Sequence, residues 1–193
     1  SIERSIKAAT KSKARTAEQR IADAVLLMGV KDYDRAADVL NEVVEKYSDH
    51  PTTLADGMRL LGETYFKNKQ YLSARRLYQD ILDRGGERRF AAYREQAVVR
   101  LVDIALRTRD LGSLSRVFAQ AASFPASGSA ALSYAKGKGL YAQGKLDAAV
   151  ASLMSVGAEG QYAHQAAYLL GVIATKQIAP STPTEEEVAP EPK

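Results

Sequence analysis

Two neighbouring stretches of sequence decide the fold: LGETYF at residues 61–66 and YLSARRLYQDI at residues 71–81. In an α-helix, residues at i, i+3, i+4 and i+7 lie on one face. The residues with this spacing are Met58, Leu61, Gly62 and Tyr65 in the first stretch, and Ala74, Leu77, Tyr78 and Ile81 in the second. Because the polar residues 67–70 separate the two faces, the sequence predicts two helices that pack on each other.

Two small residues, Gly62 and Ala74, lie on the facing sides of this predicted pair. A glycine inside a helix costs about 1 kcal/mol relative to alanine, so its presence needs a packing reason. We therefore expect the two helix backbones to approach closely at Gly62.

The same pattern recurs along the chain. The residues equivalent to Gly62 are spaced 34 to 40 residues apart, and they are Ala24, Gly62, Val102, Gly137 and Gly171. The matching pairs in the second helices are Ala36 with Leu40, Ala74 with Tyr78, Leu114 with Phe118, and Ala149 with Leu153. A helix-turn-helix unit with such a period is typical of stacked repeats. The fifth unit has only its first helix.

The second unit resembles the tetratricopeptide repeat (TPR) family, and its matching residues are Leu61, Gly62, Tyr65, Ala74 and Tyr78. The resemblance covers residues 16–176. It implies an all-α fold, a right-handed α-solenoid of about four helical hairpins plus a further helix. Another helical-hairpin repeat remains an alternative for the weaker copies, which have Ala24 and Val102 where the family prefers Gly.

A narrower resemblance concerns YSDHP at residues 47–51, followed by Ala55, Leu61-Gly62 and Tyr65. These residues look like the repeats of bacterial cell-envelope TPR proteins of the outer-membrane assembly, Tol-Pal and gliding-motility systems. The resemblance implies a periplasmic or cell-envelope location, with the cytoplasm as the alternative. The chain has no Cys, which excludes disulfides and thiolate metal sites but fits either compartment.

Composition divides the chain into three parts. Residues 1–15 form a basic segment that we expect to be a helical extension, and residues 16–176 form the solenoid. Residues 177–193 are rich in Pro and Glu and predict a disordered tail or linker. No apolar run approaches the eighteen or so residues that would span a bilayer, so we expect no transmembrane segment. Because the chain starts at Ser1 without an apolar leader, we expect an excised domain or a processed product.

The formal net charge of +4 is unevenly distributed. Residues 1–15 contain five basic residues and one acidic residue, whereas residues 180–193 contain four Glu and one Lys. The body between them is nearly balanced, which disfavours strong binding to nucleic acid. We interpret the basic segment first as a helix leading into the repeats, with a nucleic-acid or anionic-lipid contact as the alternative.

The spacing and the breaks between apolar faces predict nine helices. Their expected ranges are 3–29, 33–47, 52–68, 71–84, 88–108, 111–122, 129–142, 146–155 and 160–176.

No constellation of residues indicates catalysis. His50 and His164 have no partner at metal-ligand spacing, and we expect both to be structural or surface residues. The sequence Gly137-Lys138-Gly139 is too short for a phosphate loop; on a helix, Gly137 fits close packing and Gly139 an exposed position. We therefore expect no enzyme activity, cofactor, metal or small-molecule substrate.

In the TPR family, the first helices of the units line a concave groove. The resemblance places the groove residues three before and one, four and five after each residue equivalent to Gly62. The candidate partner-binding residues are Arg59, Glu63, Phe66, Lys67, Asp103, Arg107, Tyr134, Lys138, Tyr141 and Tyr168. The three Tyr can serve as binding anchors, because each offers contact area and a hydroxyl. The alternative is that one or more of them fills the core between units.

The leading hypothesis is a non-enzymatic protein-protein interaction module or scaffold that binds a protein or peptide segment in this groove, within a bacterial envelope complex. One alternative is self-assembly into a homo-oligomer through an end of the stack. Another is a nucleic-acid-binding helical repeat, which would use the basic segment with Arg75, Arg76, Arg88 and Arg89.

Overall fold

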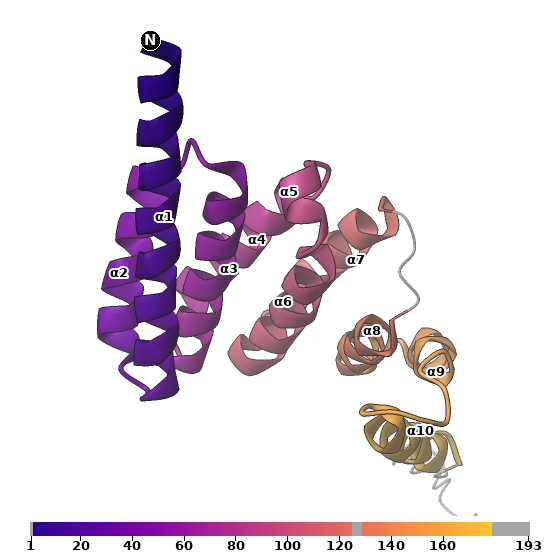
Figure 1. The fold of residues 1–193 in the computed structure, drawn as a ribbon. Helices are drawn as coiled ribbons and strands as arrows, with labels where there is room; N and C mark the ends of the chain where they lie inside the picture. Colours follow the sequence, from indigo (N-terminus) through magenta and orange to yellow (C-terminus); the bar gives the residue numbers. More distant parts are fainter. Residues whose placement is uncertain (1, 125–128, 179–193) are drawn as a thin grey trace, which may run out of the picture.

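A computed structural model describes residues 2–124 and 129–178, and every regular element within these ranges is a helix (Figure 1). In chain order they are α1 (Ile2–Gly29), α2 (Tyr33–Lys46), α3 (Pro51–Lys67), α4 (Tyr71–Asp83), α5 (Arg88–Ala91), α6 (Arg94–Thr108), the 3₁₀ turn η1 (Leu111–Ser113), α7 (Leu114–Ala122), α8 (Ala130–Ala142), α9 (Leu146–Met154) and α10 (Ala163–Ile178). The all-α prediction is confirmed. Residues 179–193 of the predicted tail lie outside the described residues.

Neighbouring helices pack against each other throughout the described part of the chain. Helix α2 packs between α1 and α3, and α4 packs between α3 and α6. Further along, α6 contacts both α7 and α8, while α9 contacts α8 and α10. Figure 1 shows α1, α3, α6 and α8 following one another along this stack. No helix among the described residues is both long and apolar enough to cross a membrane.

Three glycines determine how closely the helices approach. A Cβ atom on Gly62 would lie 3.1 Å from the buried ring of Tyr78, which confirms the close approach expected between α3 and α4. A Cβ atom on Gly137 would lie 2.6 Å from the Leu153 side chain of α9. The expectation that Gly139 is exposed is wrong, because it is buried and its Cβ would lie 2.7 Å from Phe118 Cζ. That face of α8 packs toward α7.

These contacts predict opposite effects for alanine at two equivalent repeat positions. Gly137→Ala would force its Cβ against Leu153; overpacking costs about 1–3 kcal/mol, and the helix-propensity gain of about 1 kcal/mol offsets part of that cost. We expect a net loss of up to about 2 kcal/mol in the free energy of unfolding. Gly171→Ala meets no atom within 4 Å and should raise it by about 1 kcal/mol. Urea unfolding of both variants measures the difference, and two shifts of the same sign would contradict this packing.

The predicted helix over residues 88–108 is wrong in one respect, because the chain breaks into α5 and α6 at Ala92 and Tyr93. At the break, the Tyr93 amide donates a hydrogen bond to the Phe90 carbonyl oxygen (2.9 Å). The break allows Phe90 to be fully buried. It also allows the Tyr93 hydroxyl to donate to the Asp56 carboxylate of α3. Tertiary contacts have therefore overridden a continuous helical pattern.

The other observed helix limits differ from the predicted ones by only a few residues. The predicted helix at residues 160–176 begins only at Ala163 and continues to Ile178. Gly157 and Gly160 have φ angles of 85° and 97°, so the chain turns there before α10 begins. The predicted helix at residues 111–122 begins as the 3₁₀ turn η1.

The largest apolar core lies in the middle of the stack. It joins buried residues of α3 to α8, including Tyr78, Phe90 and Leu114. A separate cluster links α8, α9 and α10 through Leu153 and Ile173. Because this cluster holds α10 beside α8, it positions the side chains of the candidate site.

Candidate functional site

A connected row of charges crosses three helices, and we call it the charge ladder: Glu63 of α3, Arg100 and Asp103 of α6, and Lys138 of α8. The Arg100 guanidinium donates from Nε and Nη2 to the two Glu63 carboxylate oxygens, at 2.9 and 2.8 Å. It also donates to Asp103 at 3.4 Å. Lys138 Nζ donates to the other Asp103 oxygen at 2.8 Å. Side chains 37 and 35 residues apart along the chain are thereby fixed to one another.

Two groups that hydrogen-bond to Glu63, Tyr78 and Arg100, have pKa values raised above their usual range. The Tyr78 hydroxyl donates to Glu63 Oε2 at 3.0 Å. Burial, reinforced by the negative charge of Glu63, raises the pKa of Tyr78 far above its usual value. Burial opposes the charge on Arg100, but the hydrogen bonds and charge of Glu63 outweigh it and raise the pKa of the guanidinium. At neutral pH, Tyr78 is therefore a neutral donor and Arg100 a cation.

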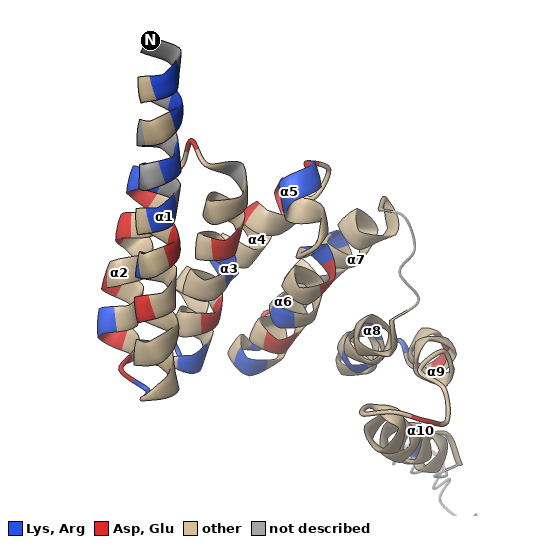
Figure 2. Ribbon diagram, viewed as in Figure 1, with Lys and Arg blue, Asp and Glu red and all other residues tan. Residues whose placement is uncertain are grey.

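On one side of the ladder, two arginine side chains lie over aromatic rings. The Arg100 guanidinium lies 4.5 Å from the Phe66 ring centroid, and Arg107 lies 5.4 Å from the same ring. Arg107 also lies 5.9 Å from the Tyr71 centroid. Figure 2 shows Lys, Arg, Asp and Glu interspersed along α3 and α6 and few charges on α8 to α10. The surface therefore changes from charged to mainly uncharged along the stack.

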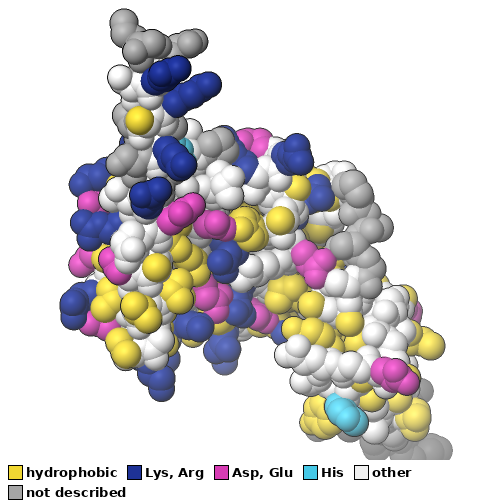
Figure 3. All heavy atoms as spheres, viewed as in Figure 1, with side chains coloured by type: hydrophobic (Ala, Val, Ile, Leu, Met, Phe, Trp, Pro, Cys, Tyr) yellow, Lys and Arg dark blue, Asp and Glu magenta, His cyan; other side chains and the backbone are white. Residues whose placement is uncertain are grey.

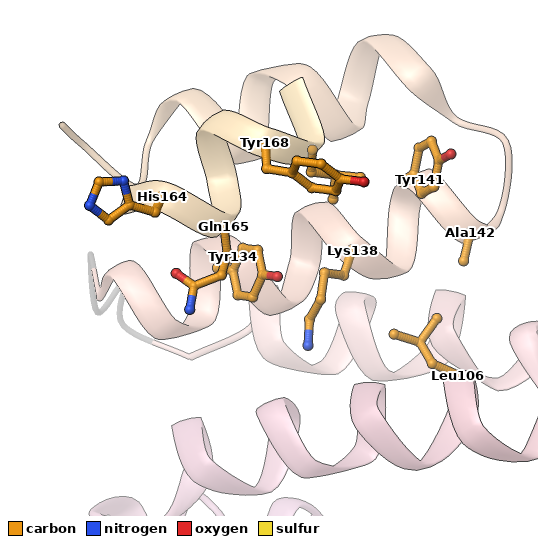
Figure 4. Close-up of a pocket in the computed structure, with 9 residues that line it drawn as sticks. Leu106, Tyr134, Lys138, Tyr141, Ala142, His164, Gln165 and Tyr168 are labelled. Atoms are coloured by element: carbon orange, nitrogen blue, oxygen red, sulfur yellow. The ribbon is translucent and has the colours of Figure 1, made fainter. Parts of the chain in front are cut away.

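A cavity of about 520 Å³ lies where the charges become sparse, between α8 and α10 with Leu106 of α6 at one side. We call it the tyrosine cavity, because Tyr134, Tyr141 and Tyr168 line it (Figure 4). Most of the exposed lining is apolar. Its size and apolar character suit the side chains of an extended ligand.

The three tyrosines have different surroundings. Tyr134 stacks on Tyr162 with ring centroids 5.4 Å apart, and Lys138 Nζ lies 4.9 Å from its centroid. Lys176 Nζ lies 4.7 Å from the Tyr141 centroid. Tyr168 is 75% exposed, and Figure 4 shows its ring extending from α10 toward Tyr141. Tyr134 and Tyr141 also pack against the α8–α10 core, which supports the alternative that they fill the core between units, while their role as binding anchors stays a prediction.

The structure brings most of the predicted site residues together. Tyr134, Lys138, Tyr141 and Tyr168 line one cavity. The ladder contains Glu63, Asp103 and Lys138, with Lys67 4.0 Å from Glu63 and with Phe66 and Arg107 beside it. Arg59 lies one helical turn before Glu63 on α3 and packs over the Tyr93 ring at 5.3 Å, without joining the ladder. Partner binding by any of these residues stays a prediction.

Four residues of the ladder and the tyrosine cavity were not predicted from the sequence. Arg100 joins the ladder, and the only local signal for it was a carboxylate at Asp103 on the same helix. His164, Gln165 and Leu169 line the tyrosine cavity from α10. Their spacing around Tyr168, one helical turn or less, could have indicated them.

A second cavity, of about 750 Å³, lies among α5 to α9, and Phe124, the last described residue before the gap at 125–128, lines it. Six of the residues lining it are alanines, and none of the ten predicted site residues contributes. The tyrosine cavity is the smaller one, but four of the predicted site residues line it.

No protein-family model matches this chain, and no curated protein sequence matches it. Its assignment to the tetratricopeptide repeat family therefore stays a prediction from its own residues.

Proposed function

We propose that this chain is a non-enzymatic protein-interaction module of the tetratricopeptide type, a right-handed solenoid that holds a partner segment against α3, α6, α8 and α10. The observation that carries this proposal is the tyrosine cavity, because four side chains selected by repeat position line it together. We further propose that the module works in a bacterial cell envelope, on the basis of the resemblance at residues 47–65.

The side chains of this surface suit the binding of a peptide. Tyrosine buries a large area at low entropic cost, and its hydroxyl still finds a hydrogen-bond partner. Tyr168 is largely exposed, so a bound ligand can bury a large part of its surface. The charge ladder orders Arg100, Asp103 and Lys138 before any partner arrives. Such preorganisation reduces the entropy lost on binding.

Selection from a random display library of extended peptides tests the proposal without knowledge of the natural partner. We expect the full chain to enrich a set of peptides, and the combined change Tyr141→Ala and Tyr168→Ala to weaken their binding by about tenfold or more, as for central aromatic anchors. Tyr33→Ala, at the start of α2 and far from the cavity, is the matched control and should bind normally. Enriched peptides that bind equally well to all three proteins would contradict the proposal.

Self-assembly remains a second candidate, because apolar side chains are uncovered at both ends of the stack. Leu26 and Val30 are exposed at the end of α1, where Figure 3 shows hydrophobic side chains gathered. At the other end, Ile178 is exposed and Gly171 faces open space. Sedimentation equilibrium discriminates between the two functions. A mass that rises with concentration and returns to that of one chain in Leu26→Lys would favour self-assembly.

A further inference from the structure

We propose that residues 180–192 of this chain bind the tyrosine cavity, so that a partner must displace the chain's own acidic, proline-rich segment. This inference deepens the proposed function, because it names the chemistry of the segment that the groove accepts. It rests on three observations: the aromatic lining of the cavity, the cations around it, and the place where α10 ends.

The lining of the cavity suits proline. Three tyrosine rings and the side chains of Leu106 and Leu169 form its apolar surface. Aromatic-lined grooves bind proline-rich segments well, because the polyproline II conformation is already extended and loses little entropy on binding. The segment contains four prolines, Pro180, Pro183, Pro190 and Pro192.

The cations around the cavity suit glutamate. Within the described part of the chain, Arg107 and Lys176 form no ion pair with a carboxylate, and both lie over tyrosine or phenylalanine rings. Lys138 is already paired with Asp103. Among the described residues, Lys176 therefore lies at the cavity without an acidic partner, and Arg107, which follows Leu106 of the lining, is a second unpaired cation on the side toward Phe66 and Tyr71. The segment has four glutamates for them, Glu185, Glu186, Glu187 and Glu191, and only Lys193 follows as a cation.

The segment also starts in the right place. Lys176, in the last turn of α10, lies over Tyr141 of the cavity, so the chain leaves α10 beside the site. Thirteen residues in the polyproline II conformation span about 40 Å. Helix α10 has sixteen residues, so the distance from its last residue back to its first is about 24 Å. The segment can therefore reach Tyr134, and its covalent attachment gives an effective concentration of about millimolar.

Paramagnetic relaxation in NMR spectra tests this contact in the full chain. The chain has no Cys, so Ala189→Cys accepts a single nitroxide label. We expect the label to cause loss of the amide signals of Tyr141, His164 and Tyr168. The amide of Leu72, on the exposed side of α4, is the internal reference and should keep its signal.

Two further samples make the result specific. Changing Glu185, Glu186 and Glu187 to Gln in the labelled chain should restore the cavity signals, because the length and the prolines are unchanged while the charge is removed. In a second sample, nitroxide-labelled chain without ¹⁵N is mixed with ¹⁵N-enriched chain without nitroxide. This mixture should show no loss of the cavity signals, since we assign the segment to the cavity of its own molecule. Signals that persist with the label, signals that stay lost in the Gln variant, or a loss confined to the mixture would each overturn the proposal.

This result is separable from that of the proposed function. If displayed peptides bind in a Tyr141- and Tyr168-dependent manner while the labelled segment stays away from the cavity, only the assignment of residues 180–192 fails. If both the segment and the peptides fail to bind, the groove itself is not a binding site.

Discussion

Replacing Phe90 with alanine is expected to lower the free energy of unfolding by about 3–5 kcal/mol, the usual cost of removing a fully buried aromatic side chain. Phe90 has no exposed surface, although it belongs to a helix of only four residues. Arg84 and Arg89 lie over its ring at 4.6 and 5.4 Å. The ring therefore anchors the α4–α6 connection to the largest core of the molecule.

Urea unfolding followed by circular dichroism measures this effect, with Leu72→Ala as the control. Leu72 is 67% exposed on α4, so its replacement should change the free energy by no more than about 0.5 kcal/mol. A Phe90→Ala variant as stable as this control would mean that α5 is not part of the folded core.

Replacing Glu63 with alanine should be the second most costly change, lowering the free energy of unfolding by about 2–3 kcal/mol. Removing one partner of a buried ion pair costs about 3–5 kcal/mol, because the other charge stays buried. Glu63 is only 12% exposed, but Arg100 is 27% exposed and retains Asp103 at 3.4 Å. The remaining solvent and the second carboxylate therefore reduce the cost below that range.

A double-mutant cycle separates this pair from general packing effects. The coupling between Glu63→Ala and Arg100→Ala should be about 1–3 kcal/mol, as for residues in one buried network. Lys46→Ala removes the exposed pair with Glu42, at 2.7 Å, and should lower the free energy of unfolding much less than Glu63→Ala does. Equal costs for Glu63→Ala and Lys46→Ala would show that the ladder is solvated and contributes no more than a surface pair.

The ladder was predicted from the sequence only in part. Repeat position identified Glu63, Asp103 and Lys138 as sharing a surface, because helical periodicity determines which side of a helix each residue occupies. It did not identify their pairing through Arg100. That pairing joins side chains 37 residues apart, and their distance depends on how α3 and α6 are placed by other contacts.

The break between α5 and α6 has the same kind of cause. The residues over 88–108 have the local character of one helix, and nothing near Ala92 in the sequence demands a turn. The turn follows from the burial of Phe90 and from the contact of Tyr93 with Asp56, also 37 residues away. Local preference is worth tenths of a kcal/mol per residue, whereas a buried ring is worth several.

The sequence by itself therefore determined most of the helices, their apolar faces and the close approach at Gly62, since these depend on neighbours within one helical hairpin. It also placed Tyr134, Lys138, Tyr141 and Tyr168 on one side of the stack. Only the tertiary structure decided that these four line a cavity and that Arg100 links Glu63 to Asp103. The physical reason is that a cavity and a charge pair are distances between helices, and the packing of the whole stack sets those distances.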